Sequence, residues 1–144
     1  MSNTYLANSL EETRKIAAEL AETLKKGTVL GLCGPLGAGK TAFTQGLTKQ
    51  LHIKDTVNSP TFTIINEYTN GPLPIYHIDL YRLTSYQEAL NTGLTEYLPS
   101  NDGITIVEWA DHIPEIMPKN FLKINIKIIE NNQREISIYE NFSF

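Results

Sequence analysis

Hydrophobic residues near the start of the chain recur with the period of an α-helix. Within residues 9–26 the apolar side chains are four positions apart and therefore share one helical face. They are Ile16, Leu20 and Leu24. Ser9 and Glu12 have the spacing of a capping box, and Lys25 to Gly27 is typical of a helix end. We therefore predict an amphipathic helix over 9–26.

Compact apolar runs further along the chain predict buried strands. Residues 28–33 and 104–108 are short, largely apolar and preceded by glycine, as in strands that are covered on both faces. A glycine-rich segment follows the first run, and residues 40–51 continue from it as a predicted helix. The order strand, glycine-rich turn, helix is the context that a phosphate-binding loop requires.

Antiparallel pairing is predicted twice. Segments 61–68 and 74–81 are extended in character and are separated by Asn70–Gly71, which is a hairpin turn signal. Residues 85–92 predict a short helix. Near the end of the chain, apolar and polar residues alternate strictly on both sides of an Asn131–Asn132 turn, so we predict a half-exposed C-terminal β-hairpin. The alternating apolar residues are Leu122, Ile124, Ile126, Ile128, Ile136 and Ile138.

The glycine-rich segment has the spacing Gly-x-x-x-x-Gly-Lys-Thr of a P-loop, so a nucleoside triphosphate and Mg²⁺ are the expected ligands. Glycines permit backbone torsions that turn successive N–H groups toward an anion, and the following helix adds its dipole. Lys40 would reach the β- and γ-phosphates, and the Thr41 hydroxyl would hold Mg²⁺. The predicted nucleotide-binding loop consists of Gly34, Pro35, Leu36, Gly37, Ala38, Gly39, Lys40 and Thr41.

Two acidic residues stand where a P-loop ATPase needs a carboxylate, and with Lys40 they are the predicted catalytic residues. Glu108 closes the apolar run 104–108, as a Walker B acid does, although aspartate is usual there. Asp79 interrupts another apolar segment, and it either acts on the attacking water or binds Mg²⁺ through water. The ordinary alternative for each is a solvated carboxylate at a strand end.

Loop 58–63 follows the predicted P-loop helix, where many NTPases place a sensor of the γ-phosphate. Its hydroxyl groups belong to Ser59, Thr61 and Thr63, which are the candidate switch residues; a plain Ser–Pro turn is the alternative. His77 is interpreted as a packed strand histidine rather than a catalyst. Trp109 either stacks on a base or a partner, or packs in the core.

The bulk composition fits one soluble globular domain. We expect the 144 residues to form a single domain over 1–144, with 41% hydrophobic and 19% charged residues. No apolar run approaches the roughly 20 residues of a membrane helix, and the polar segment 1–14 does not read as a signal peptide. Cys33 ends an apolar run and is expected to be a buried free thiol. We therefore expect a cytoplasmic protein without membrane contacts.

Charge narrows the possible partners. The net charge is −4, and the arginines are Arg14, Arg82 and Arg134 only. Autonomous nucleic-acid binding normally needs a basic patch, so stable DNA binding is not expected. Few arginines also leave few cations for catalysis. Apart from a possible use of Arg82, the chain offers no obvious arginine finger, so we expect slow hydrolysis by the chain alone and faster hydrolysis with partners.

Several segments together resemble the TsaE family, the bacterial ATPases of tRNA threonylcarbamoyladenosine biosynthesis. They occur in the order and with the spacing of the family, and the resemblance covers roughly residues 9–139. Pro35 departs from the family, in which an acidic residue is common at this position. The segments are the P-loop, Ser59–Thr63 (SPTFT), Asn66–Tyr68 (NEY), His77–Leu83 (HIDLYRL), Gly93–Leu98 (GLTEYL) and Val107–Trp109 (VEW).

The resemblance implies an α/β, three-layer P-loop NTPase-like fold with a mixed, partly antiparallel sheet and a C-terminal β-hairpin. It also implies that Thr41 and Glu108 hold Mg²⁺, that Asp79 serves hydrolysis, and that the SPTFT segment is a switch. A nucleotide contact by Arg134, and a base contact near Ser9 and Leu10, are looser implications. The implied partners are TsaB and TsaD, and TsaD transfers the threonylcarbamoyl group to the adenosine next to the tRNA anticodon. The resemblance implies that this protein contacts tRNA only through these partners.

Two other functions use the same loop. A small-molecule kinase needs several cationic side chains and a lid, for which the three arginines and the 25 residues from Leu83 to Val107 offer little material. A non-catalytic nucleotide-binding switch module needs no acid, so the two candidate carboxylates argue against it. Phosphorylation of a nucleoside or sugar would identify the kinase. If Glu108→Ala and Asp79→Ala left turnover in the assembled complex unchanged, the protein would be a non-catalytic switch module and not an enzyme.

Overall fold

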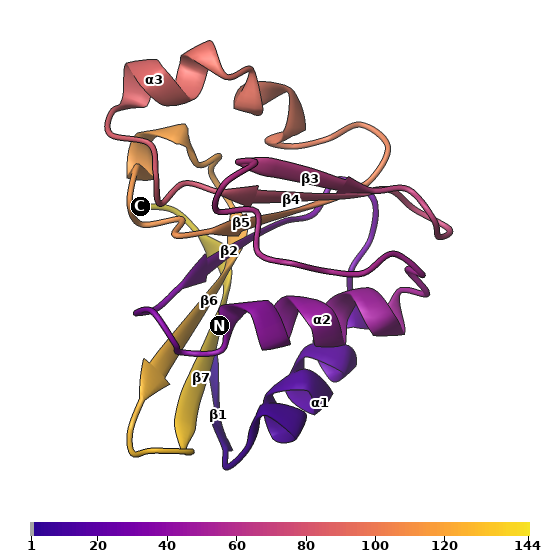
Figure 1. Ribbon diagram of the computed structural model, residues 1–144, viewed down its shortest axis with the longest axis vertical. Coiled ribbons are helices and arrows are strands. Elements are labelled where there is room, and N and C mark those ends of the chain that lie inside the picture. Colours follow the sequence, from indigo (N-terminus) through magenta and orange to yellow (C-terminus); the bar gives the residue numbers. More distant parts are fainter. Residues whose placement is uncertain (1) are drawn as a thin grey trace.

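A seven-stranded mixed sheet runs through the computed structural model, which describes residues 2–144 (Figure 1). The strand order is β1-β7-β6-β2-β5-β4-β3. The four middle strands, β6, β2, β5 and β4, are parallel, whereas β1, β7 and β3 pair antiparallel toward the edges. The strands are β1 (Ser2–Ala7), β2 (Val29–Cys33), β3 (Ile65–Tyr68), β4 (Ile75–Asp79), β5 (Ile104–Glu108), β6 (Phe121–Ile128) and β7 (Arg134–Phe142).

Helices cover both faces of the sheet, so the predicted three-layer α/β architecture is confirmed. Helices α1 (Leu10–Ala21) and α2 (Lys40–Gln50) lie on one face, and α3 (Tyr86–Asn91) lies on the other (Figure 1). Short 3₁₀ turns η1 (Leu94–Tyr97) and η2 (Pro114–Ile116) accompany α3. The core accordingly has two clusters, one beneath α1 and α2 and one on the side of α3. Within residues 2–144, none of the helices is long and apolar enough to cross a membrane.

Helix α1 begins as predicted and ends earlier. The side chain of Ser9 accepts a hydrogen bond from the backbone N–H of Glu12 at 3.1 Å, which caps the helix. The predicted end at residue 26 is wrong, since the helix stops at Ala21 and turns follow. There the Thr23 hydroxyl donates to the Leu20 carbonyl at 2.8 Å, a local bond that competes with the helix. Leu24 still packs against the core, so the apolar period continues past the helix itself.

Both predicted hairpins form, with differences at their ends. Strands β3 and β4 pair antiparallel, but residues 61–64 form a turn instead of the predicted strand. In this turn Ile64 has a positive φ of 70° and its N–H donates to the Pro60 carbonyl at 2.7 Å. The C-terminal hairpin of β6 and β7 is extended by β1, which the sequence pattern did not predict. All residues of β1 except Ala7 are exposed, so this strand carries no apolar alternation.

Candidate functional site

The candidate site lies where the parallel strands end. Strand β2 runs into the P-loop, while β4 and β5 end at Asp79 and Glu108, which are partners in the strand register. Between them and α2 lies a cavity of about 370 Å³. A crevice outside the carboxyl ends of parallel strands is the usual ligand position in α/β sheets. The residues that line this cavity are Leu10, Arg14, Leu36, Gly37, Ala38, Gly39, Lys40, Thr41, Ala42, Gln45, Ser59, Thr61, Asp79, Glu108 and Trp109.

The P-loop has the backbone that phosphate binding requires. Gly39 adopts a left-handed conformation with φ 106° immediately before α2, and no side chain caps this helix end. The first N–H groups of α2 therefore face the cavity without a capping side chain, which makes the helix end suitable for an anion. At the other end of the loop, a Cβ atom on Gly34 would collide with the Ile126 carbonyl, so the loop passes close to β6 only as glycine.

Lys40 is held inside the loop. Its Nζ donates to the carbonyls of Gly34 at 2.6 Å and Pro35 at 2.9 Å, and lies 4.1 Å from the centre of the Trp109 ring. Only 6% of this residue is exposed, and burial lowers its pKa, while the carboxylates of Glu108 and Asp79 act in the opposite direction. The only lysine of the cavity thus faces the two predicted catalytic acids.

Asp79 is buried, and each of its carboxylate oxygens accepts one hydrogen bond. The backbone N–H of Tyr81 donates to its Oδ1 at 2.8 Å, and the Thr61 hydroxyl donates to its Oδ2 at 2.9 Å. Burial is the largest influence on this carboxyl group and raises its pKa; the two hydrogen bonds oppose this shift. A buried carboxylate with a raised pKa is a stronger proton acceptor than a solvated one, which makes Asp79 suitable for work on a water molecule.

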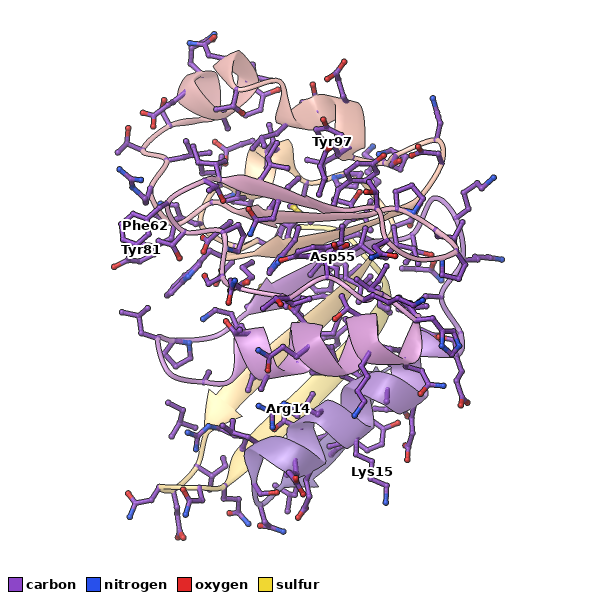
Figure 2. The ribbon with its side chains drawn as sticks, turned by 45° about the vertical axis from the view of Figure 1, so that its right-hand side comes forward. Arg14, Lys15, Asp55, Phe62, Tyr81 and Tyr97 are labelled. Atoms are coloured by element: carbon purple, nitrogen blue, oxygen red, sulfur yellow. The ribbon has the colours of Figure 1, made fainter. Side chains whose placement is uncertain are left out.

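Glu108 is also buried, and its partner is His77. The Nε2 of His77 lies 2.5 Å from the Oε2 of Glu108. The next residue, Trp109, has a positive φ of 58°, an unusual conformation that the surrounding structure must support. Its ring packs against Tyr81, with ring centres 4.8 Å apart, and in the view of Figure 2 Tyr81 and Phe62 both lie at the left-hand edge of the molecule.

The structure separates the three candidate switch residues. Ser59 and Thr61 line the cavity, their hydroxyl groups are 2.8 Å apart, and Thr61 reaches Asp79. Thr63 does not line it, and its hydroxyl donates to Oδ1 of Asn66 at 2.7 Å. The predicted loop therefore has an inner part that faces the site and an outer part that anchors it to β3.

Comparison with known proteins identifies the family. The family model described as "Threonylcarbamoyl adenosine biosynthesis protein TsaE" matches residues 7–136. The tRNA threonylcarbamoyladenosine biosynthesis protein TsaE of Bacillus subtilis is 50% identical over 127 residues, which cover 88% of this chain and 78% of that protein. The protein of the same name from Nostoc sp. is 40% identical over 141 residues, covering 96% and 85%. The crystal structure of Bacillus subtilis YdiB superposes with a TM-score of 0.84 at 40% identity, covering 99% of this chain and 87% of that one.

The chain belongs to the TsaE family. The resemblance seen in the sequence is thereby confirmed, and so is a role in tRNA threonylcarbamoyladenosine biosynthesis. The matched range begins before α1 and ends within β7, so it contains the whole candidate site. Strand β1, by contrast, lies almost entirely before the match.

Two arginines of this TsaE family member support the site from outside the cavity. Arg134 lies behind the P-loop, where it donates to the carbonyls of Gly37 at 3.3 Å and Ala38 at 3.2 Å. A direct nucleotide contact by Arg134 stays a prediction. In the structure, its two hydrogen bonds stabilise the P-loop. Arg82 donates to the Phe62 carbonyl at 3.3 Å, so in this conformation it supports the turn at 61–64 instead of pointing into the cavity.

Arg14 was missed by the sequence analysis as a site residue. It projects from α1 toward α2 (Figure 2), and its guanidinium donates to Oε1 of Gln45 at 3.2 Å. Both residues line the cavity beside the P-loop. No sequence signal identifies them, because Arg14 lies in an ordinary amphipathic helix and meets Gln45 only through the packing of the two helices.

The oxygen donors of the cavity are suitable for Mg²⁺. Among residues 2–144, no group of three or more His, Cys, Asp or Glu side chains could hold a metal ion by itself. Mg²⁺ does not need such a group, since it is usually bound through one or two carboxylates together with water and phosphate oxygens. Thr41, Glu108 and Asp79 line one cavity and offer oxygen ligands only. The chemistry of this set therefore fits the predicted magnesium.

Proposed function

We propose that this chain is a Mg²⁺-dependent ATPase that acts with TsaD and TsaB in the threonylcarbamoyl modification of the adenosine next to the tRNA anticodon. The observation that carries the proposal is the convergence of the P-loop lysine and two buried carboxylates on one cavity at the strand ends. Membership of the TsaE family supports the modification pathway, and the site geometry supports the hydrolysis.

Each site residue has a role in this proposal. The N–H groups at the start of α2 and the Lys40 ammonium bind the phosphates, since both are cationic or dipolar donors. Thr41 and Glu108 hold Mg²⁺, which supplies positive charge beside the phosphate oxygens. Asp79 orients the attacking water and accepts its proton, for which its raised pKa is suitable. Ser59 and Thr61 sense the terminal phosphate, because Thr61 already contacts Asp79.

Partners enter the proposal because the chain supplies few cations. Arg82 and Arg134 are occupied by backbone carbonyls outside the cavity, and Arg14 is held by Gln45 at its wall. An arginine supplied in trans can raise phosphoryl-transfer rates by about 10³–10⁵-fold. We therefore expect TsaD and TsaB to stimulate a slow intrinsic activity. The net charge of −4 favours contact with tRNA through these partners, in the cytoplasm.

Phosphate release from ATP, measured with and without TsaB and TsaD, tests the proposal. Glu108→Gln should lower the stimulated rate by at least about 10²-fold, since it removes a charged group from the metal site. Glu96→Gln is the matched control, because Glu96 is exposed on η1 and does not line the cavity. The proposal is wrong if both variants turn over like the wild type, or if partners leave the rate unchanged.

A further inference from the structure

A chain of buried hydrogen bonds links Glu108 to the loop at 58–63. Its members lie on three neighbouring strands, with Glu108 on β5, His77 on β4 and Tyr68 on β3. His77 contacts Glu108 through Nε2, at 2.5 Å, and the Tyr68 hydroxyl through Nδ1, at 3.1 Å. The Tyr68 hydroxyl in turn donates to the backbone carbonyl of Asn58 at 3.2 Å. The relay thus ends on the loop that also carries the candidate phosphate sensors.

The sheet register explains how these residues meet. Glu108 and Asp79 are register partners on β5 and β4, and His77 is two residues before Asp79. Successive side chains of a strand point to opposite faces, so His77 and Asp79 share the face that looks toward the P-loop. Tyr68 pairs with Ile75, which lies on this same face of β4. The relay therefore crosses three neighbouring strands, and its Glu108 end lines the cavity.

The hydrogen atoms of the relay can be placed in two ways, and His77 donates to Glu108 in both. An ionised carboxylate only accepts, so the Nε2 hydrogen of His77 must be the donor to Glu108. With a hydrogen on Nε2 alone, Nδ1 accepts from the Tyr68 hydroxyl, which then does not donate to Asn58. With a hydrogen on both ring nitrogens, Nδ1 donates to the Tyr68 hydroxyl, which donates to Asn58, and the relay is continuous. Asn58 keeps a second donor in both cases, the side-chain amide of Asn66 at 3.3 Å. Among the described residues, His77 is the only donor to this carboxylate, and it uses a single oxygen.

Stability does not explain why polar residues occupy these positions. Exposure is 0% for His77, 4% for Tyr68 and 3% for Glu108. Burying charged and polar pairs costs desolvation, and apolar residues of similar size are often equally stable in such places. Neighbours on the same strands, such as Ile75 and Ile106, are fully buried and apolar. A positioning role accounts for the polar residues, because groups behind a metal ligand fix the orientation of that ligand.

We propose that His77 and Tyr68 are positioning residues that aim the Glu108 carboxylate at the magnesium site and tie it to the 58–63 loop through Asn58. The inference rests on the proposed role of Glu108 in holding Mg²⁺. Its consequence is that the metal site and the loop respond together when the relay is continuous. A shift of Asn58 then reorients Glu108 through three hydrogen bonds, and fixing Glu108 restrains Asn58.

The test measures the affinity for a non-hydrolysable ATP analogue with and without Mg²⁺, and involves no turnover. The signal is the fluorescence of Trp109, the single tryptophan of the chain, whose ring contacts Lys40 in the cavity. The variants are His77→Leu, His77→Gln and Tyr68→Phe, with Glu108→Gln as the reference for loss of the metal ligand. Tyr76→Phe is the matched control, because Tyr76 lies on the same β3–β4 hairpin as Tyr68 and its hydroxyl donates to the exposed Asp102 at 2.9 Å.

We expect His77→Leu to lose about 10–100-fold of the Mg²⁺-dependent gain in affinity, as measured for groups behind metal ligands. Tyr68→Phe should lose part of this gain. Affinity without Mg²⁺ should stay at the wild-type value in both. His77→Gln should restore most of the gain, since its amide can donate to Glu108 and accept from Tyr68. Tyr76→Phe should behave like the wild type.

A second measurement follows the loop itself. The side chain of Phe62 is 84% exposed, so chymotrypsin cleavage after it reports the order of this loop. With Mg²⁺ and the analogue, cleavage should slow in the wild type and in Tyr76→Phe, and should stay fast in Tyr68→Phe. If His77→Leu does not fold, Tyr68→Phe decides the question, because it removes one oxygen atom only.

The outcomes separate the two proposals. Wild-type Mg²⁺ dependence in Tyr68→Phe and His77→Leu, together with its loss in Glu108→Gln, would overturn the positioning role and leave the proposed function intact. Wild-type Mg²⁺ dependence in Glu108→Gln would remove the metal role of Glu108, and the inference would fail with it.

Discussion

Asp79→Asn should make the folded chain more stable while it abolishes most of the partner-stimulated ATP turnover. The two effects have opposite signs because the same buried charge is unfavourable for folding and required for the chemistry. Only 1% of Asp79 is exposed, and burial raises its pKa above the ordinary value of 3.8. The ionised carboxylate is therefore less favourable in the folded chain than in the unfolded chain, where water solvates it.

The hydrogen-bond network can accept the amide without leaving a group unpaired. Oδ1 would still accept from the Tyr81 N–H. The new Nδ2 would donate to the Thr61 hydroxyl, which would turn its own hydrogen to Ser59, 2.8 Å away. Replacements that relieve such functional strain commonly add about 0.5–2 kcal/mol to the free energy of unfolding. For a chain of this length that corresponds to a rise in Tm of about 2–6 °C.

The stability that Asp79→Asn adds should decrease as the pH falls. The folded-state pKa of Asp79 lies above its unfolded value, so the wild type gains stability relative to Asn as the pH falls and the carboxyl group is protonated. The advantage of Asp79→Asn should therefore be complete above the folded-state pKa and vanish as the pH approaches about 4. Thermal unfolding of both proteins by circular dichroism, at several pH values, measures this.

Asp102→Asn is the matched control for the direction of the stability change. Asp102 is exposed, and hydrogen bonds from Ser100 and Tyr76 lower its pKa. The control should therefore lose stability at neutral pH and keep wild-type turnover. For Asp79→Asn we expect turnover to fall by about 10²–10⁴-fold. A lower Tm at neutral pH, or a gain that does not change with pH, would refute the burial argument, and normal turnover would refute the catalytic role.

Three further predictions concern packing, the P-loop and nucleic acid. Gly46→Ala places a methyl group against the backbone of Arg14 where α1 and α2 cross, and should cost about 1–3 kcal/mol or more in urea unfolding; an unchanged midpoint would contradict this close approach. Arg134→Ala removes the donors to Gly37 and Ala38 and should weaken ATP binding in calorimetry with or without Mg²⁺ alike; a loss seen only with Mg²⁺ would indicate another role. The isolated chain should show no tight tRNA binding in filter assays at low salt, since its net charge is −4. Tight, salt-sensitive binding would contradict the proposal that this protein contacts tRNA through its partners.

The sequence predicted those features that depend on local chemistry. The P-loop is a contiguous motif between a strand and a helix, so its residues identify it without knowledge of the sheet. Glu108 was recognised because it ends an apolar run, and Asp79 because it interrupts one. In the structure both residues end parallel strands, which brings them together. Their convergence on one cavity follows from strand order, which a single sequence leaves open.

The features that were missed depend on contacts between distant segments. Strand β1 is almost wholly exposed and is ordered by its pairing with β7, so it has no apolar signature of its own. His77 was read as a packed strand histidine, and it is buried, but its contact with Glu108 spans 31 positions of the chain. The turn at Ile64 depends on a hydrogen bond to Pro60 inside a segment of strand-forming residues. Local propensity cannot reveal any of these contacts.

The central claim is that this chain supports threonylcarbamoyl transfer to tRNA through its ATP site. The most direct measurement is the formation of threonylcarbamoyladenosine on tRNA by TsaB and TsaD, supplied with the threonylcarbamoyl donor, over many turnovers. We predict sustained product formation only when both the wild-type chain and ATP are present, and early arrest with Glu108→Gln. Equal product formation with and without this chain, or with Glu108→Gln in its place, would contradict the account.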